Sequence, residues 1–220
     1  MNHPPLKRQA YAQFARIGQA LASERRLELL DLLAQAPRHV EALAQETGLS
    51  VASVSQHLQV LRHAKLVEAS RQGTKAVYRL ADHGETLRLW LALCAVAESR
   101  LPELEQIRRR FTVEGAAPGE LSREELQRRV ERGDVLLIDV RPSVEYRAGH
   151  LPGAVSLPLE ELPARLGELP RDRQIVAYCR GRYCLMADEA VALLRRHGFD
   201  AVRVEGGWPE WHAEGRPVEP

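Results

Sequence analysis

The spacing of apolar residues changes once along the chain, and this change constrains the fold more than any other feature. Over residues 10–110 apolar side chains mostly recur at intervals of three and four, which is typical of amphipathic helices. Over residues 120–204 short apolar runs alternate with helical patterns, which predicts a mostly parallel β-sheet covered on both faces. Glycines and a proline interrupt both patterns between these regions, in Thr112–Gly119. The sequence therefore predicts two domains.

We place the domain boundaries on either side of this interrupted segment. Residues 1–111 are expected to form the first domain, residues 112–119 the linker and residues 120–217 the second domain. The first domain should be all-α with a β-wing, and the second should be an α/β domain.

A helix-turn-helix is predicted in the first domain. Val40–Thr47 has helical spacing and is followed by Gly48, a residue that tolerates the left-handed conformation at a helix end. Ser50 is placed to cap a second helix over residues 51–64. The residues expected on the buried face of this second helix are Val54, Leu58 and Leu61. Two short helices joined by a tight turn with a glycine are the pattern of a helix-turn-helix.

The rest of the first domain is predicted to be helical apart from one hairpin. Ser23 divides the apolar pattern of residues 10–34 into two helices, and alternating runs in residues 68–80 predict a β-hairpin around Gln72–Thr74. A last helix over residues 83–100 continues beyond Pro102. Its apolar stripe consists of Leu87, Trp90, Leu91, Cys94 and Ala97. Because so small a domain offers this stripe no partner, we expect a homodimer.

The charge of the chain is unevenly distributed. The overall net charge of +1 combines 16 basic and 11 acidic residues up to Val113 with 15 basic and 19 acidic residues after it. The net charges of the two parts are therefore +5 and −4. A basic domain beside an acidic one favours a nucleic-acid partner for the basic one.

Polar side chains on the second helix of the helix-turn-helix point to DNA recognition, because such a helix reads base edges from the major groove. The candidate base-reading residues are Ser53, Ser55, Gln56, His57, Gln59 and Arg62. Arg71 and Lys75 of the hairpin are expected to contact the phosphates of double-stranded DNA. The alternative interpretation is a solvated helix face in a module that contacts proteins.

Residues 14–101 resemble the ArsR/SmtB type of winged helix-turn-helix repressor. The matching segments are Leu43–Ser50, Val54–Leu58, Leu61–Val67 and Arg71–Tyr78. The resemblance implies a homodimer that binds a palindromic operator and leaves it when an inducer binds. His39–Leu43 lacks the Cys-x-Cys pair of thiolate metal sensors, so no metal site is expected. Cys94 is either a small core residue or a redox-sensitive thiol.

In the second domain a cysteine follows the strand predicted at residues 174–178. Cys179 opens the loop Cys179–Cys184, and a helix is expected over residues 185–197. Backbone N–H groups at a helix N-terminus stabilise a thiolate, so we expect a lowered pKa and nucleophilic chemistry at Cys179. Arg180 and Arg182 add positive charge for an oxyanion substrate or for the thiolate itself.

Residues 118–217 resemble a single rhodanese domain. The matching segments are Leu136–Pro142, Glu145–Ala154, Val176–Gly181 and Gly206–Trp211. The resemblance implies a persulfide on Cys179, loaded by a sulfane-sulfur donor and passed to a thiol acceptor, without a cofactor. The residues that would line the substrate site are Arg180, Gly181, Arg182, Tyr183 and Cys184, and Asp139 and Arg141 would support the loop.

Cys184 stands where the rhodanese family usually has a small hydroxylic or aliphatic residue. It is expected either to be structural or to exchange the persulfide for a disulfide or polysulfide bridge with Cys179.

The cysteine count and the absence of an apolar leader indicate a cytoplasmic protein. Residues 87–96, the most apolar stretch, are too few to span a bilayer, so no membrane partner is expected.

We predict a DNA-binding transcriptional regulator that captures sulfane sulfur, with sulfur or redox status coupled to operator binding. One alternative is a sulfurtransferase whose winged module serves dimerisation or docking. Another is an inactive rhodanese fold that binds a partner.

Overall fold

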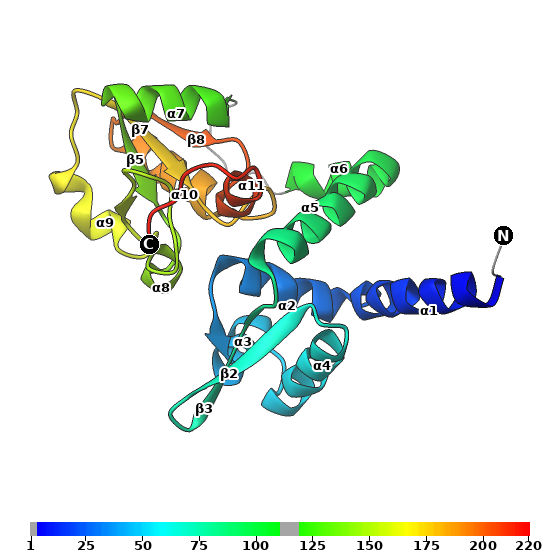
Figure 1. Cartoon of the computed structure of the whole chain (residues 1–220). Coiled ribbons are helices and arrows are strands. Elements are labelled where there is room, and N and C mark those ends of the chain that lie inside the picture. Colours follow the sequence, from blue (N-terminus) through cyan, green and yellow to red (C-terminus); the bar gives the residue numbers. More distant parts are fainter. Residues whose placement is uncertain (1–3, 111–118) are drawn as a thin grey trace. The chain divides into compact units, whose positions relative to one another are not determined.

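The computed structural model describes residues 4–110 and 119–220. The chain divides into two compact units between Trp90 and Leu91 (Figure 1). This boundary falls inside helix α5, His83–Arg100. Among the described residues, no helix has the length and apolar character needed to cross a bilayer.

The first unit is a helical domain with a small antiparallel sheet, as predicted. Its helices before α5 are α1 Pro4–Leu21, α2 Glu24–Gln35, α3 Val40–Thr47 and α4 Val51–His63. The sheet has the order β1-β3-β2, with β1 Arg38–His39, β2 Val67–Gln72 and β3 Lys75–Leu80. The sequence predicted every one of these elements except β1, whose two residues are too few to show a pattern.

The helix-turn-helix forms as its sequence signals predict. Gly48 ends α3 in the left-handed region, with φ of +69°. The Ser50 hydroxyl accepts a hydrogen bond from the Ser53 backbone N–H at 3.1 Å and so caps α4. The predicted inner face of α4 is fully buried, at Val54, Leu58 and Leu61. This packing fixes which side chains of α4 face outward.

The predicted hairpin is confirmed, and the structure gives its register. Gln72 pairs with Lys75 across a two-residue turn, and Gly73 has φ of +61°. Beyond Val67 strand β2 is exposed on both sides, whereas β3 buries Val77 and Tyr78. In the hairpin, β2 is therefore largely exposed to solvent, and the buried side chains of β3 hold it against the domain.

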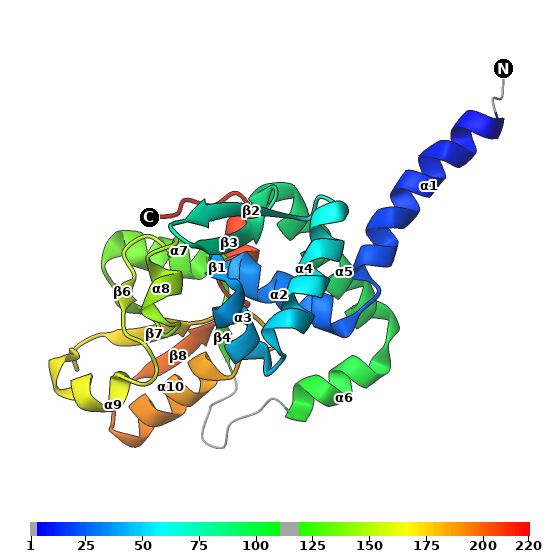
Figure 2. The same cartoon turned by 90° about the horizontal axis from the view of Figure 1, so that it is seen from below.

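Helix α1 extends away from the other helices of the first unit in both views (Figures 1 and 2). Its apolar side chains Leu6, Tyr11 and Phe14 are exposed.

The second unit contains a five-stranded, all-parallel sheet with the order β4-β8-β7-β5-β6. The strands are β4 Glu120–Leu121, β5 Val135–Asp139, β6 Val155–Ser156, β7 Gln174–Tyr178 and β8 Ala201–Val204. The helices after α5 are α6 Pro102–Arg110, α7 Arg123–Arg132, α8 Ser143–Tyr146, α9 Leu162–Arg165, α10 Met186–Arg196 and α11 Trp208–Ala213, with a 3₁₀ turn at Leu166–Glu168.

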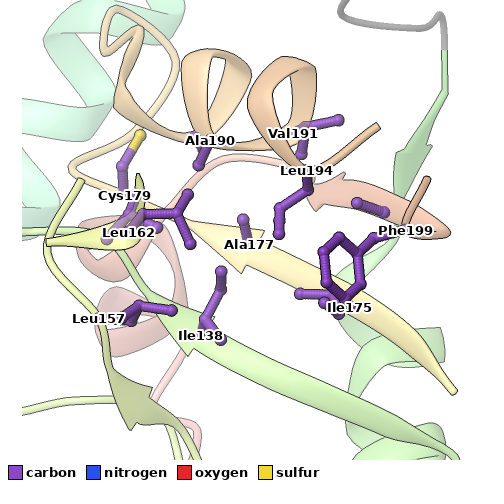
Figure 3. Packing of buried hydrophobic residues seen from close by; sticks show 13 residues of the cluster. Ile138, Leu157, Leu162, Ile175, Ala177, Cys179, Ala190, Val191, Leu194 and Phe199 are labelled. Atoms are coloured by element: carbon purple, nitrogen blue, oxygen red, sulfur yellow. The ribbon is translucent and has the colours of Figure 1, made fainter. Parts of the chain in front are cut away.

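Helices cover both faces of this sheet, which confirms the predicted α/β architecture (Figure 2). On one face, Ile138 and Ala177 of the strands pack in a cluster with Leu194 of α10 and with α9 (Figure 3). The other face packs Leu126 of α7 and the indoles of α11 against the strands. Short elements were missed at β4, β6, α8 and α11. The predicted linker, apart from Gly119, lies outside the described residues.

Candidate functional site

Cys179 lies at the carboxyl end of the central strand β7, where the chain leaves the sheet for the loop Cys179–Cys184. Its side chain is buried, with 1% of its surface exposed. Figure 3 shows its sulfur at the end of the apolar cluster, near the start of α10. Its backbone carbonyl accepts a hydrogen bond from the Trp208 N–H at 3.1 Å. The loop is thus held between the sheet and α11.

Cys179 and Cys184 lie close enough for each to shift the pKa of the other. Cys179 Sγ donates to the Cys184 carbonyl at 3.5 Å and to the Gly181 carbonyl at 4.0 Å. The Cys184 N–H in turn donates to the Gly181 carbonyl at 3.2 Å. The loop therefore folds back on itself and brings its two ends together.

The ionisation of this pair differs from the sequence expectation. Burial and the neighbouring Cys184 raise the pKa of Cys179, although hydrogen bonds with the backbone of Gly181 and Ala187 oppose the rise. The pKa of Cys184 is lowered, chiefly by the hydrogen bond from Cys179. The expectation of a lowered pKa at Cys179 was wrong, because loss of hydration outweighs the backbone contacts.

Arg180 is bound to a buried carboxylate. Its guanidinium donates from Nε to both carboxylate oxygens of Glu145, at 2.9 and 3.1 Å, and Nη2 makes a third contact. The Glu145 side chain is fully buried in α8, and 21% of the Arg180 side chain is exposed. The charge of Arg180 is therefore largely balanced within the protein.

The other loop residues differ in exposure. Arg182 and Tyr183 are exposed, and Arg182 lies 3.9 Å from the carboxylate of Glu205. Gly181 has φ of +127°, and a Cβ there would come within 3.3 Å of both carboxylate oxygens of Glu210. Glu210 Oε2 accepts a hydrogen bond from the Gly207 N–H at 2.9 Å, and burial raises the pKa of this carboxyl. Gly181 is thus required by the close approach of α11.

Asp139 and Arg141 form a fully buried ion pair at the end of β5, with Nη2 of Arg141 2.6 Å from Oδ2 of Asp139. The Tyr178 hydroxyl donates to the same carboxylate at 2.6 Å. The Arg141 guanidinium also lies 5.1 Å from the ring centre of Trp208, and the backbone N–H of Trp208 donates to the Cys179 carbonyl. A chain of direct contacts therefore runs from this ion pair to the cysteine loop.

Sequence reasoning assigned no role to Glu145, Gly207, Trp208 or Glu210. All four lie inside the segments that carry the rhodanese resemblance, so the resemblance marked the right stretches without saying what each side chain contacts. Tyr178 was expected only as a strand residue.

The predicted DNA-reading side chains all lie outside the fully buried face of α4. Gln56 and Arg62 are exposed, and the others are half-buried: Ser53, Ser55, His57 and Gln59. Arg71 and Lys75 are exposed on the hairpin. Arg79, by contrast, donates to Glu68 at 2.8 Å across the two strands. The surface formed by α4 and the hairpin is therefore polar and basic.

The predicted apolar stripe of α5 is only partly covered. Leu87 is fully buried, whereas Trp90, Leu91, Cys94 and Ala97 are half-buried. No group of three His, Cys, Asp or Glu side chains among the described residues is placed to hold a metal ion.

Comparison with known proteins matches each half of the chain to a protein family. Residues 23–69 match the family described as "Bacterial regulatory protein, arsR family", and residues 122–214 match the "Rhodanese-like domain". The HTH-type transcriptional regulator Rv0324 of Mycobacterium tuberculosis is 46% identical over 94% of this chain and 90% of its own length. The chain belongs to the arsR family of bacterial regulatory proteins. This member carries a rhodanese-like domain after its winged helix-turn-helix.

Other relatives of this arsR-family chain match one half only. A sulfurtransferase of Allochromatium vinosum is 37% identical over 42% of this chain and 85% of its own length. A homodimeric winged helix-turn-helix DNA-binding domain from Mycobacterium bovis covers 46% of this chain and 93% of its own, with 42% identity and a TM-score of 0.43. A rhodanese-related protein from Thermoplasma volcanium covers 46% and 96%, with 27% identity and a TM-score of 0.42.

Proposed function

We propose that this arsR-family regulator captures sulfane sulfur as a persulfide on Cys179, and that capture changes its affinity for a DNA operator. The observation that carries the proposal is the position of Cys179, at the carboxyl end of the central strand of a rhodanese-like domain and within hydrogen-bonding contact of a second cysteine. Sulfur transfer needs a cysteine nucleophile in a fixed position, and the end of strand β7 fixes the position of Cys179.

The first step is attack by the Cys179 thiolate on the outer sulfur of a donor such as thiosulfate. A sulfur–sulfur bond forms to Cys179, the bond in thiosulfate breaks and sulfite leaves with the electron pair. A thiol acceptor then takes the outer sulfur from the persulfide. Backbone contacts from Gly181 and Ala187 favour the thiolate form of Cys179 and partly oppose the rise of its pKa by burial.

Asp139 and Arg141 act as supports in this proposal. Both side chains are fully buried and neutralise each other, so neither is available to exchange protons with a substrate. Their contact with Trp208 fixes α11, and the Trp208 N–H holds the Cys179 carbonyl. Arg180 belongs to the same supporting set through Glu145. Arg182 is the more exposed cation of the loop, and an anionic donor would compete for it with Glu98, its ion-pair partner at 3.0 Å.

Thiosulfate-dependent sulfur transfer to cyanide tests the capture step. We expect the full chain to form thiocyanate and Cys179→Ser to form none. Equal activity in the two proteins would contradict the assignment of Cys179. Lack of activity in both would favour the interpretation of an inactive rhodanese fold that binds a partner.

On the DNA side, we propose that residues 1–111 act as a cytoplasmic homodimer that places α4 in the major groove of a palindromic operator, with the hairpin on the flanking phosphates. The exposed polar face of α4 and the basic hairpin support this placement. The linker would comprise residues 112–119 and the rhodanese domain residues 120–217.

Operator binding before and after thiosulfate treatment tests the coupling. We expect the dissociation constant for a palindrome from the promoter of its own operon to change on treatment of the full chain and to stay constant for Cys179→Ser. Identical affinities of the treated and untreated chain would refute the coupling. Failure to bind the palindrome at any salt concentration would favour a sulfurtransferase with a docking module.

A further inference from the structure

The loop Cys179–Cys184 contains two interacting thiols, whereas capture of a sulfur atom requires only one. Cys179 and Cys184 each shift the pKa of the other, and the Cys179 sulfur lies 3.5 Å from the carbonyl oxygen of Cys184. Cys184 packs against the same apolar cluster that buries Cys179. The residue that carries the second thiol is therefore in direct contact with the atom that would carry the persulfide.

Burial makes this internal thiol the favoured attacker. With 1% of its surface exposed, Cys179 is poorly accessible to an external thiol. Attack by Cys184 needs no encounter between molecules and no opening of the site, and such oriented intramolecular reactions are favoured by many orders of magnitude over bimolecular ones.

The ionisation of the pair agrees with these roles. In the reduced loop the pKa of Cys184 is lowered, chiefly by the hydrogen bond from Cys179, which is lost on loading. Backbone contacts with Arg180 and Met186 and the charge of Arg180 also lower this pKa and do not depend on the Cys179 hydrogen. Thiol–disulfide exchange needs the attacking sulfur as thiolate and is faster when the leaving thiol has a lower pKa. Hydrosulfide is a better leaving group than a buried cysteine thiolate.

We propose that Cys184 resolves the persulfide on Cys179, so that sulfur capture ends in a Cys179–Cys184 disulfide and the release of hydrogen sulfide. This inference rests on the proposed function, since it begins with the persulfide. The Cys184 thiolate forms a bond to Sγ of Cys179, the bond from Sγ to the outer sulfur breaks, and the outer sulfur leaves with the electron pair as hydrosulfide. The two cysteines are oxidised by two electrons and the sulfane sulfur is reduced by two, so no further oxidant is needed.

When Cys184 attacks before an external acceptor takes the outer sulfur, the loop records one captured sulfur as a covalent bridge. The bridge persists until an external thiol reduces it. Loading removes the hydrogen of Cys179 Sγ, and with it the hydrogen bond to the Cys184 carbonyl, and the bridge then joins the two sulfurs covalently. A change of loop structure therefore follows from the chemistry itself.

The test uses the full chain in a Cys94→Ser background, which leaves Cys179 and Cys184 as its cysteines. Reduced protein is treated with thiosulfate without oxygen, quenched with acid, alkylated and weighed by mass spectrometry, and sulfite and sulfide are measured. A sample without thiosulfate gives the background oxidation. The matched comparison is the same background with Cys184→Ser.

We expect the protein with both loop cysteines to lose the mass of two hydrogen atoms, to resist alkylation, and to release one sulfide for each sulfite. The Cys184→Ser protein should gain the mass of one sulfur, release sulfite and release no sulfide. Retention of the added sulfur with both loop cysteines present, whether on Cys179 or Cys184, would overturn the inference while leaving capture intact. No sulfite from either protein would contradict capture itself, and the inference with it.

Discussion

The guanidinium of Arg180 binds the carboxylate of Glu145, with Nε 2.9 Å from Oε1, and thereby ties the cysteine loop to helix α8. The carboxylate is fully buried and the guanidinium is about four-fifths covered, with 21% of its side chain exposed. A positive charge held in this way contributes to loop position more than to the attraction of an anionic substrate. Arg180 is therefore an anchor, whereas the sequence suggested an equal role for Arg180 and Arg182.

Glu145→Gln is expected to loosen the loop. The change removes the charge from a buried, charge-assisted contact, which costs about 1–3 kcal/mol in the unfolding free energy of the second unit. Misplacement of Cys179 should also slow sulfite release from thiosulfate by roughly tenfold or more. Glu160→Gln removes the same charge at an exposed position and serves as the control. Equal behaviour of the two variants would show that the anchor is dispensable.

Gly207→Ala is expected to displace the same loop from the side of α11. A Cβ at this position would lie 2.3 Å from the Cys179 carbonyl oxygen and 2.4 Å from the Gly181 nitrogen, so the backbone must shift. Such overpacking costs about 1–3 kcal/mol, and we expect sulfur loading to fall with it.

Gly167→Ala is the matched control for that substitution. A Cβ at Gly167 meets nothing within 4 Å and the residue does not need a left-handed conformation. Loading rates from stopped-flow or sulfite assays should be unchanged for Gly167→Ala and reduced for Gly207→Ala. Wild-type loading in Gly207→Ala would refute the tight packing of α11 on the loop.

The long elements could be predicted from the sequence because each has many residues in one pattern. Strands β7 and β8 were placed at their observed bounds, and α7 and α10 within one residue. The missed β4, β6 and α8 have two to four residues each, which is too short for a period to be visible. Their formation depends on neighbours distant in sequence, as when Val155 pairs with Ile138.

The position of Cys179 followed from sequence, but its electrostatics did not. The sequence alone shows that a cysteine lies between a predicted strand and a predicted helix, and the helix N-terminus suggests a stabilised thiolate. How deeply the sulfur is buried, and that Cys184 is its hydrogen-bond partner, depend on how the loop folds back. The same holds for Arg180, whose partner Glu145 lies 35 residues earlier.

Ser50→Ala is expected to weaken DNA binding through the start of α4. Loss of the cap leaves the Ser53 N–H without its acceptor and costs about 1 kcal/mol. Because the candidate base-reading residues begin at Ser53, fraying of this turn should raise the operator dissociation constant severalfold.

Ser122→Ala provides the control in the second unit, because Ser122 caps α7 through the same contact, from the Glu125 N–H at 3.2 Å. We expect a similar loss of stability, measured by thermal unfolding, and unchanged operator affinity. A Ser50→Ala protein with wild-type affinity would place DNA recognition elsewhere.

The pH dependence of sulfur loading should move when Cys184 is replaced. Negative charge on Cys184 disfavours ionisation of its neighbour and helps to raise the pKa of Cys179. In Cys184→Ser this charge is absent and the hydroxyl can donate to the Cys179 thiolate, so the pKa of Cys179 falls. The rate of sulfite release against pH should therefore reach its midpoint at a lower pH than in the wild type. A midpoint that is unchanged or higher would contradict the coupling of the two thiols.

Lys75→Ala is expected to weaken operator binding by an electrostatic, sequence-independent effect. Lys75 is exposed at the start of β3, next to the hairpin turn, where it can neutralise a phosphate. Removing one such contact should lower the slope of log affinity against log salt by about 1, with equal losses on operator and unrelated DNA.

Arg79→Ala is the comparison on the same strand. Because Arg79 already binds Glu68 at 2.8 Å, its loss should change the slope less. Titrations at several salt concentrations measure both slopes, and a larger change for Arg79→Ala would show that the hairpin approaches DNA with its other end.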